Sequence, residues 1–153
     1  MLEIRGDIFE LQADAIGITT NGIVRKNGNA IMGAGVAKAA NDRYPGIDQR
    51  LGKYLRQYGN RVFILHRAST SPWEDEPREL FSFPTKEHWR HPSSLELIER
   101  SAKQLVDLAD KRDWQQVILP QPGCGLGGLD WQQQVRPLLA EIWDQRFIIS
   151  QGL

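Results

Sequence analysis

The sequence predicts an α/β layered domain with a largely parallel sheet. Short apolar runs typical of β-strands alternate along the chain with segments of helical periodicity. Helices between most of the strands favour parallel neighbours, because a parallel connection needs a crossover element. The chain has 153 residues, of which 41 % are hydrophobic, and this is the size and apolar content of one ordinary domain. We therefore expect a single domain over residues 1–153.

One of the connections between the β-type runs differs from the others. The runs lie at residues 2–5, 15–20, 61–67, 79–83, 116–120 and 146–150. The connection over residues 68–78 is too short, and too interrupted by prolines, to hold a crossover helix. The third and fourth strands are therefore expected to be antiparallel if they are neighbours, which makes the sheet mixed.

Helical segments fill the remaining gaps. Residues 34–43 are rich in alanine and stop before Pro45, and residues 47–58 end at Gly59, which suits a C-cap. After Pro92, residues 93–96 match a capping box, and apolar residues then recur at helical spacing at Leu95, Ile98, Ala102, Leu105 and Ala109. A last helix follows Asp130, with an apolar side made of Val135, Leu138, Leu139 and Ile142. Its Pro137 predicts that the main part begins near Val135, after a separate first turn.

Charge and composition exclude several classes of protein. The 19 basic and 19 acidic residues cancel, so no overall field attracts nucleic acid or membrane, and any anion site must be local. Apolar runs are far shorter than a membrane span of about 20 residues, and the N-terminus has no signal-peptide core. We expect a soluble, cytoplasmic protein that binds no membrane. A single cysteine, with no CxxC or HExxH pattern, predicts neither a disulfide nor a metal site, and Cys124 is interpreted as a packing residue rather than a nucleophile.

A glycine-rich loop follows the fifth strand. Its sequence Gly123-Cys124-Gly125-Leu126-Gly127-Gly128-Leu129 contains GxGxxG, the fingerprint of a dinucleotide fold. That fold needs an acidic residue about 20 positions later, at the end of the next strand, and the corresponding region here, Phe147-Ile148-Ile149-Ser150, has none. A Walker A loop is excluded too, because no Lys-Ser or Lys-Thr pair follows the glycines. The remaining interpretation is a phosphate cradle, in which backbone N–H groups and the start of a helix attract an anion.

A second loop of the same kind lies at residues 31–37, again before a helix. Two backbone cradles suit a diphosphate better than a single phosphate. The alternative is that each loop is merely a tight turn that lets a helix pack closely on a strand.

In both order and spacing these motifs resemble those of the macrodomain family. The resemblance rests on Gly6-Asp7-Ile8, Ala13-Asp14-Ala15-Ile16, Thr20-Asn21-Gly22, Met32-Gly33-Ala34-Gly35-Val36 and the loop from Gly123 to Trp131. It covers residues 2–150 and implies an ADP-ribose-binding, three-layer α/β/α domain with a mixed central sheet. Together with residues 83–90, the loop from Gly123 to Trp131 is most similar to the DNA ADP-ribosyl glycohydrolase antitoxins and the terminal ADP-ribose protein glycohydrolases.

The resemblance implies a role for each motif. Asp7 and Ile8 would bind the adenine, Asn21 would face the distal ribose, and the two glycine loops would bracket the pyrophosphate, while Thr20 would be a further residue of the ADP-ribose site. The loop residues concerned are Met32, Gly33, Ala34, Gly35 and Val36, and Gly123, Cys124, Gly125, Leu126, Gly127, Gly128 and Leu129. Asp7 and Asn21 can equally be ordinary turn residues. Ile18 stands where the family usually has a further asparagine, so one distal-ribose contact is missing.

Lys86 and Asp130 are the candidate catalytic residues. In the glycohydrolases that this chain resembles, the lysine matching Lys86 acts on the distal ribose, by attacking the anomeric carbon or by stabilising the opened sugar. The alternative is a solvated cation in a basic loop with His88, Arg90 and His91. The protein-directed subgroup has an aspartate where Gly127 stands here, so Asp130 is the remaining acid, unless it only caps the following helix.

The resemblance therefore implies an ADP-ribosyl hydrolase that needs no cofactor and acts on modified DNA or a protein ester. A non-catalytic reader of ADP-ribose and a phosphatase for ADP-ribose 1″-phosphate are the alternatives. Nucleic acid as the acceptor requires that Lys86, His88, Arg90 and His91 share a face with Arg25 and Lys26. We expect a monomer.

Overall fold

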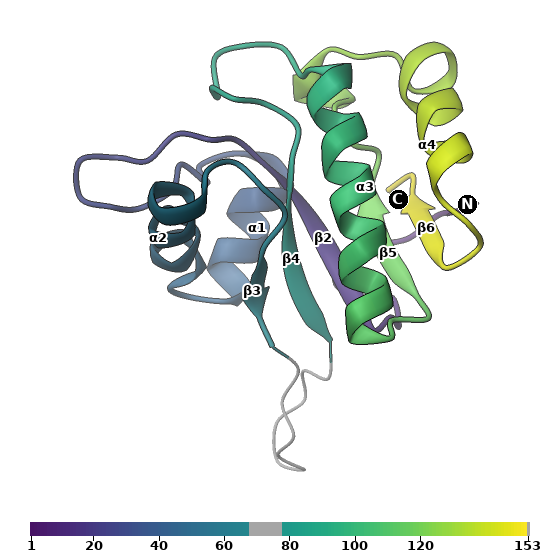
Figure 1. The fold of residues 1–153 in the computed structure, drawn as a ribbon, viewed down its shortest axis with the longest axis horizontal. Helices are drawn as coiled ribbons and strands as arrows, with labels where there is room; N and C mark the ends of the chain where they lie inside the picture. The colour runs from purple at the N-terminus through teal and green to yellow at the C-terminus, as the bar shows by residue number, and fades with distance from the viewer. Residues whose placement is uncertain (68–77, 153) are drawn as a thin grey trace.

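A six-stranded sheet forms the centre of the molecule (Figure 1). The computed structural model describes residues 1–67 and 78–152, so nearly all of the expected linker over residues 68–78 lies outside the described residues. The strands are β1 (Leu2–Ile4), β2 (Ala15–Thr20), β3 (Ile64–His66), β4 (Glu79–Pro84), β5 (Val117–Pro120) and β6 (Phe147–Ser150). Their order across the sheet is β1-β6-β5-β2-β4-β3.

The prediction of a mixed sheet is confirmed. β1 with β6, β6 with β5, β5 with β2 and β2 with β4 pair in parallel, whereas β3 runs antiparallel to β4. β3 is shorter than expected because side chains replace part of its ladder. The N–H group of Phe63 donates to Ser82 Oγ at 3.0 Å, and that of Val62 donates to Gln104 Oε1 at 3.0 Å.

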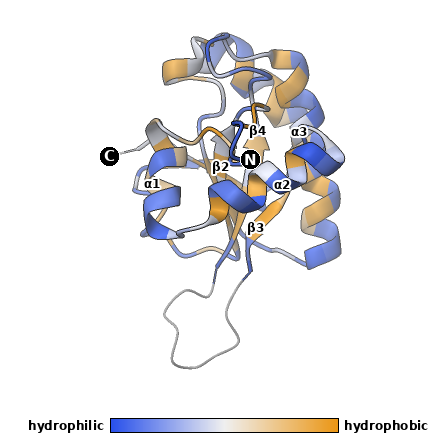
Figure 2. Ribbon diagram, turned by 90° about the vertical axis from the view of Figure 1, so that its left-hand side faces the viewer, coloured by the Kyte–Doolittle hydropathy of each residue, from blue (hydrophilic) through white to orange (hydrophobic). Residues whose placement is uncertain are grey.

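Helices cover both faces of the sheet and complete the three layers. α1 (Gly35–Arg43) and α2 (Ile47–Tyr58) pack on one face, and α3 (Leu95–Arg112) and α4 (Arg136–Ile142) pack on the other. The buried side chains of β5 alternate accordingly, since Ile118 joins the α1/α2 core while Val117 and Leu119 join the α3/α4 core. In Figure 2 the strands are largely hydrophobic, whereas hydrophilic stretches mark the helices.

The helix ends agree with the sequence in two cases and differ in a third. Gly59 ends α2 with a positive φ of 84°, and Pro137 follows a π-helical turn over Trp131–Val135, as expected. The prediction of a capping box over residues 93–96 is wrong, because the N-cap of α3 is Ser94, whose Oγ accepts from Leu97 N at 3.2 Å. Ser93 instead donates its backbone N–H to Gly127 O at 2.9 Å, which holds it outside the helix.

The parallel strands β2, β4 and β5 end at one edge of the sheet, where the connections to α1, α3 and α4 begin. In open parallel sheets this carboxyl edge is where ligands bind. No helix within residues 1–67 and 78–152 is long and apolar enough to span a membrane.

Candidate functional site

A cavity of about 880 Å³ opens at the carboxyl edge of the sheet. This volume lies within the range of small-molecule sites. Its lining consists of Thr19 and Thr20 at the end of β2, Asn21 after it, residues 31–37 before and in α1, Thr85 and Lys86 after β4, residues 89–93 before α3, Gly123, Cys124, Leu126, Gly127 and Gly128 after β5, and Arg25. Ends of three parallel strands and the starts of two helices therefore meet at one site.

Both glycine loops face this cavity, although about 90 residues separate them in the chain. In chain order, the first glycine loop is residues 31–37 and the second is residues 123–129. The first loop leads into α1, whose N-cap Ala34 has no side chain that can accept a hydrogen bond from the helix. The N–H groups of the first turn of α1 are thus left for a ligand. In the second loop Gly128 has a φ of 79°, a left-handed conformation that favours glycine. This pair of backbone surfaces has the chemistry of an anion site.

Gly127 lies against Ser93. A Cβ atom on Gly127 would lie 2.2 Å from Ser93 Oγ and 3.1 Å from Ser93 Cβ, so only glycine fits without movement. The backbone bond from Ser93 N to Gly127 O fastens the glycine loop to the start of α3. Sequence reasoning missed Ser93 and Thr85 as lining residues, and their only signal was nearness to Lys86 in the chain.

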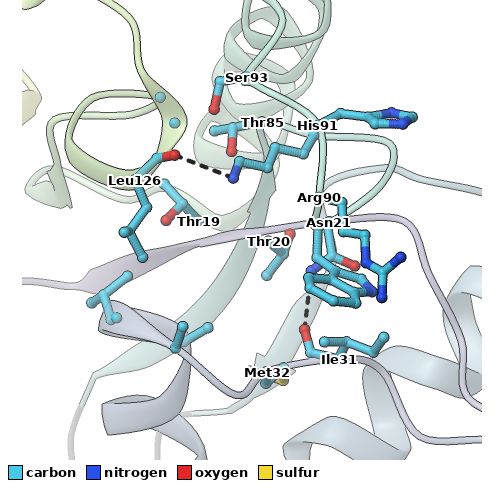
Figure 3. Close-up of a pocket in the computed structure, with 18 of the residues that line it drawn as sticks. Thr19, Thr20, Asn21, Ile31, Met32, Thr85, Arg90, His91, Ser93 and Leu126 are labelled. Carbon is cyan, nitrogen blue, oxygen red and sulfur yellow. Dashed lines mark hydrogen bonds between the residues drawn. The ribbon is translucent and has the colours of Figure 1, made fainter.

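Lys86 extends into the cavity from the end of β4, and its Nζ approaches Leu126 O at 3.5 Å, the outer limit of a hydrogen bond (Figure 3). Its backbone is held in place, since Asn60 Nδ2 donates to Lys86 O at 3.1 Å and Gly22 N donates to Glu87 O at 3.2 Å. Asn60 was not predicted from the sequence. The lysine nitrogen therefore lies beside the second glycine loop on a fixed backbone.

Thr20 and Asn21 line the cavity at the end of β2. Asn21 Nδ2 donates to Ile31 O at 3.1 Å and Asn21 Oδ1 accepts from Ile23 N at 3.1 Å, so the side chain ties β2 to the first glycine loop (Figure 3). One amide hydrogen and one lone pair remain for a ligand. Asn21 thus has a structural role that leaves capacity for binding.

Several predicted site residues do not line the cavity. Asp7 and Ile8 are outside it, and Asp7 Oδ1 accepts from Phe9 N at 2.9 Å, as a turn aspartate does. Gly125 and Leu129 belong to the second loop but are not part of the lining. Their proposed contacts with adenine and pyrophosphate therefore have no counterpart among the residues around this cavity.

Asp130 is also placed away from the cavity lining, where it caps a helical turn. Its Oδ1 accepts from Gln133 N at 2.7 Å, and it is the N-cap residue of the segment Trp131–Val135. This geometry supports the alternative that Asp130 is a cap, and no Asp or Glu among residues 1–67 and 78–152 lines the cavity. The lysine is left without a carboxylate partner among the lining residues.

Cys124 lines the cavity and is half-buried. Burial, and then the nearby charge of Asp130, raise the pKa of its thiol, so the thiol is protonated at neutral pH. This agrees with the interpretation of Cys124 as a packing residue. Within the described part of the chain, no three His, Cys, Asp or Glu side chains are grouped so that they can hold a metal ion.

The lining is basic although the chain is neutral overall. Arg25, Lys86, Arg90 and His91 all line the cavity, while Lys26 and His88 do not. Phe83, three residues before Lys86, does not line the cavity, because its ring is buried in the α3/α4 core. Trp89 lines the cavity, with 43 % of its surface exposed.

Comparison with known proteins gives one family. A family model described as Macro domain matches residues 26–137. A Thermus aquaticus protein named DNA ADP-ribosyl glycohydrolase is 32 % identical over 152 residues, which cover 92 % of this chain and 39 % of that protein. The chain therefore spans about two fifths of the length of this relative.

Solved structures show the same relationship. The macrodomain of T. aquaticus DarG superposes with a TM-score of 0.76 at 31 % identity, and that of Mycobacterium tuberculosis DarG with 0.77 at 26 % identity. Each comparison covers 97 % of this chain and 95 % of the other.

Proposed function

This chain belongs to the macrodomain family, and from that premise we propose that it binds ADP-ribose in the cavity and hydrolyses the bond between the distal ribose and a modified macromolecule. The observation that carries the proposal is the meeting of both glycine loops with Lys86 around one cavity. The backbone N–H groups bind the diphosphate, which leaves the lysine free for the sugar.

We propose DNA as the modified macromolecule. The T. aquaticus relative is named for this activity. The basic lining supports the same choice, since Arg25, Lys86, Arg90 and His91 line the cavity and none of its described lining residues is acidic. Of the six basic residues named for nucleic acid binding, Arg25, Lys86, Arg90 and His91 line the cavity together, whereas Lys26 and His88 do not.

Hydrolysis adds water across the bond at the anomeric carbon, so that the carbon receives the hydroxyl group and the acceptor receives the proton. Lys86 can take part in two ways. Its neutral amine can attack the anomeric carbon and later be displaced by water, or it can stabilise the opened form of the sugar. Treatment with borohydride during turnover traps a lysine adduct only where a carbon–nitrogen double bond forms.

The test is replacement of Lys86. In Lys86→Ala we expect release of ADP-ribose from an ADP-ribosylated oligonucleotide to fall on the order of a hundredfold or more, the range of a side chain that takes part in a chemical step. Calorimetry should show that affinity for free ADP-ribose is kept, because the glycine loops remain. Lys111→Ala, at the far end of α3, is the matched control and should change neither quantity.

A different result would change the assignment. If Lys86→Ala releases ADP-ribose as fast as the parent, Lys86 has no catalytic role. A parent that binds ADP-ribose tightly but cleaves no linkage would be a reader, and the absence of a carboxylate from the cavity lining favours this second candidate. Release of inorganic phosphate from ADP-ribose 1″-phosphate would instead indicate a phosphatase.

A further inference from the structure

The proposed function uses the glycine loops and Lys86, but it leaves the residues that follow Lys86 without a task. Trp89 is one of four large apolar side chains exposed in the described structure, and two of these, Trp89 and Leu126, line the cavity. Trp89 and Leu126 come from the segment before α3 and from the second glycine loop. An exposed indole at the mouth of a ligand cavity indicates contact with something larger than the ligand.

Trp89 is the centre of a stack with its two chain neighbours. The Arg90 guanidinium lies over the indole at 4.7 Å from the ring centroid, and the His88 ring lies 5.7 Å from it at an interplanar angle of 24°. Arg90 N donates to His88 Nδ1 at 3.1 Å, which fixes the histidine ring beside the indole. We call His88, Trp89 and Arg90 the rim stack.

The backbone below the rim stack is anchored. Glu87 Oε2 accepts from Asn60 Nδ2 at 3.1 Å, and Glu87 Oε1 accepts from Arg100 at 3.2 Å. Together with the bond from Gly22 to Glu87 O, these contacts fix the segment that carries both Lys86 and the rim stack. The distance from the lysine to the stack is therefore set by the fold.

The carboxylate nearest to the rim stack in the chain, Glu87, is already paired with Arg100, whereas two cations of the cavity are not paired with an acid among the described residues. Neither Arg25 nor Arg90 forms an ion pair with an acid in the described part of the chain, and both line the cavity. Figure 3 shows Arg90 on the side of the cavity that Asn21 and Ile31 form, across from Leu126. Free guanidinium groups beside an aromatic platform suit a ligand that alternates flat rings with phosphates.

We propose that the rim stack, with Arg25, is the docking surface for the nucleic acid strand that carries the ADP-ribose. An unpaired base next to the modified nucleotide stacks on the rim stack, of which the Trp89 indole is the centre, and the neighbouring phosphates contact Arg90 and Arg25. A duplex cannot offer the face of a base in this way, so the strand is single. This inference rests on the proposed function, because it names the surface that holds the acceptor of that reaction.

The experiment compares binding of a labelled ten-nucleotide single strand, of its duplex and of free ADP-ribose. Trp89→Ala should weaken binding of the single strand by about 5-fold to 100-fold, the effect of losing one base stack. Arg90→Gln should make the affinity for the strand less dependent on salt. The slope of log affinity against log salt should become shallower by about the amount that one phosphate contact contributes. Because Trp89 and Arg90 also line the cavity, each variant should lose clearly less affinity for free ADP-ribose than for the strand. Strand binding should quench indole fluorescence in the parent and not in Trp89→Ala.

Matched controls are Tyr58→Ala, an exposed aromatic residue at the end of α2, and Lys111→Gln, an exposed cation at the end of α3. Neither should change strand binding. The proposal is overturned if Trp89→Ala and Arg90→Gln bind the strand as the parent does, if the duplex binds as well as the strand, or if free ADP-ribose loses affinity equally. It is also overturned if Trp89→Ala and Arg90→Gln weaken the binding of ADP-ribosylated peptides but not the binding of the strand.

These outcomes separate the two proposals. If the parent binds the strand through Trp89 but releases no ADP-ribose, the hydrolase proposal fails and the docking surface stands. If Lys86→Ala abolishes turnover while Trp89→Ala leaves strand binding and KM unchanged, the hydrolase stands and the docking surface fails.

Discussion

At the scale of single residues, Ser93 and Gly127 act as a pair. Ser93 is only 7 % exposed, and its Oγ is buried without a hydrogen-bond partner in the described structure. The missing side chain of Gly127 leaves the space that this hydroxyl occupies. The position of the second glycine loop over α3 therefore depends on a hydroxyl that contributes volume but no bond.

This pair gives a prediction for stability. Gly127→Ala should lower the free energy of unfolding by about 1–3 kcal/mol, because the new methyl group overlaps Ser93 Oγ. Ser93→Ala alone should cost less, since removing an unpaired buried hydroxyl breaks no hydrogen bond. In the double variant the cost of the alanine at position 127 should shrink, although the contact with Cβ at 3.1 Å remains. Urea unfolding of all four proteins measures this, and additive costs would contradict the pairing.

At the scale of elements, the turn that begins at Asp130 joins the glycine loop to α4. Asp130 caps this turn through Gln133 N, and Gln134 Oε1 accepts in return from Asp130 N at 2.9 Å. The role of Asp130 is thus to start the helix that covers the α3/α4 core.

Asp130→Ala should therefore lower the free energy of unfolding by about 1 kcal/mol, the usual effect of losing an N-cap. Asp130→Asn keeps an accepting side-chain oxygen and should keep most of the stability. Neither variant should reduce the rate of ADP-ribose release per folded molecule. A loss of turnover in Asp130→Asn with unchanged stability would instead place the carboxylate in the reaction.

Elements were predictable where local pattern decides them. Short apolar runs predicted the six strands and helical spacing predicted the four helices to within a few residues, because the helices bury one periodic face and strands such as β4 and β6 are buried on both faces. The N-cap of α3 was predicted one residue too early, since Ser93 and Ser94 are alike in type and only the distant Gly127 O distinguishes them.

The site was predictable where backbone chemistry decides it. The glycine loops and Lys86 were found from the sequence because their motifs are local. Asn60, Ser93 and the cap role of Asp130 depend on which segments meet in space, and no spacing in the sequence reveals that.

At the scale of the whole molecule, the two ends of the chain are joined at one edge of the sheet. β1 pairs with β6 in parallel, and Gln151 N donates to Ile4 O at 2.9 Å. Glu3 on β1 accepts from Trp131 Nε1 at 2.8 Å and from Arg136 Nε at 2.9 Å. A single carboxylate thus links the first strand to the last helical segment.

That carboxylate gives the molecule a pH-dependent contribution to stability. Partial burial raises the pKa of Glu3. Hydrogen bonds from Arg136 and Trp131 and the charge of Arg136 together lower it by more than burial raises it, so its pKa lies below the ordinary value of 4.5. Because the folded pKa is lowered, the contribution is fully present above the unfolded pKa and is lost as pH falls through the folded pKa.

Glu3→Gln should therefore be less stable than the parent at pH 7, by up to about 1 kcal/mol for a largely surface ion pair. The difference should shrink as the pH falls through the lowered pKa of Glu3, because the parent then also loses the charge. Urea unfolding of both proteins from pH 7 to pH 3 measures this difference. Glu141→Gln, an exposed carboxylate on α4 without an ion pair among the described residues, should differ from the parent by the same small amount throughout. A Glu3→Gln difference that stays constant with pH would show that the carboxylate acts by shape alone.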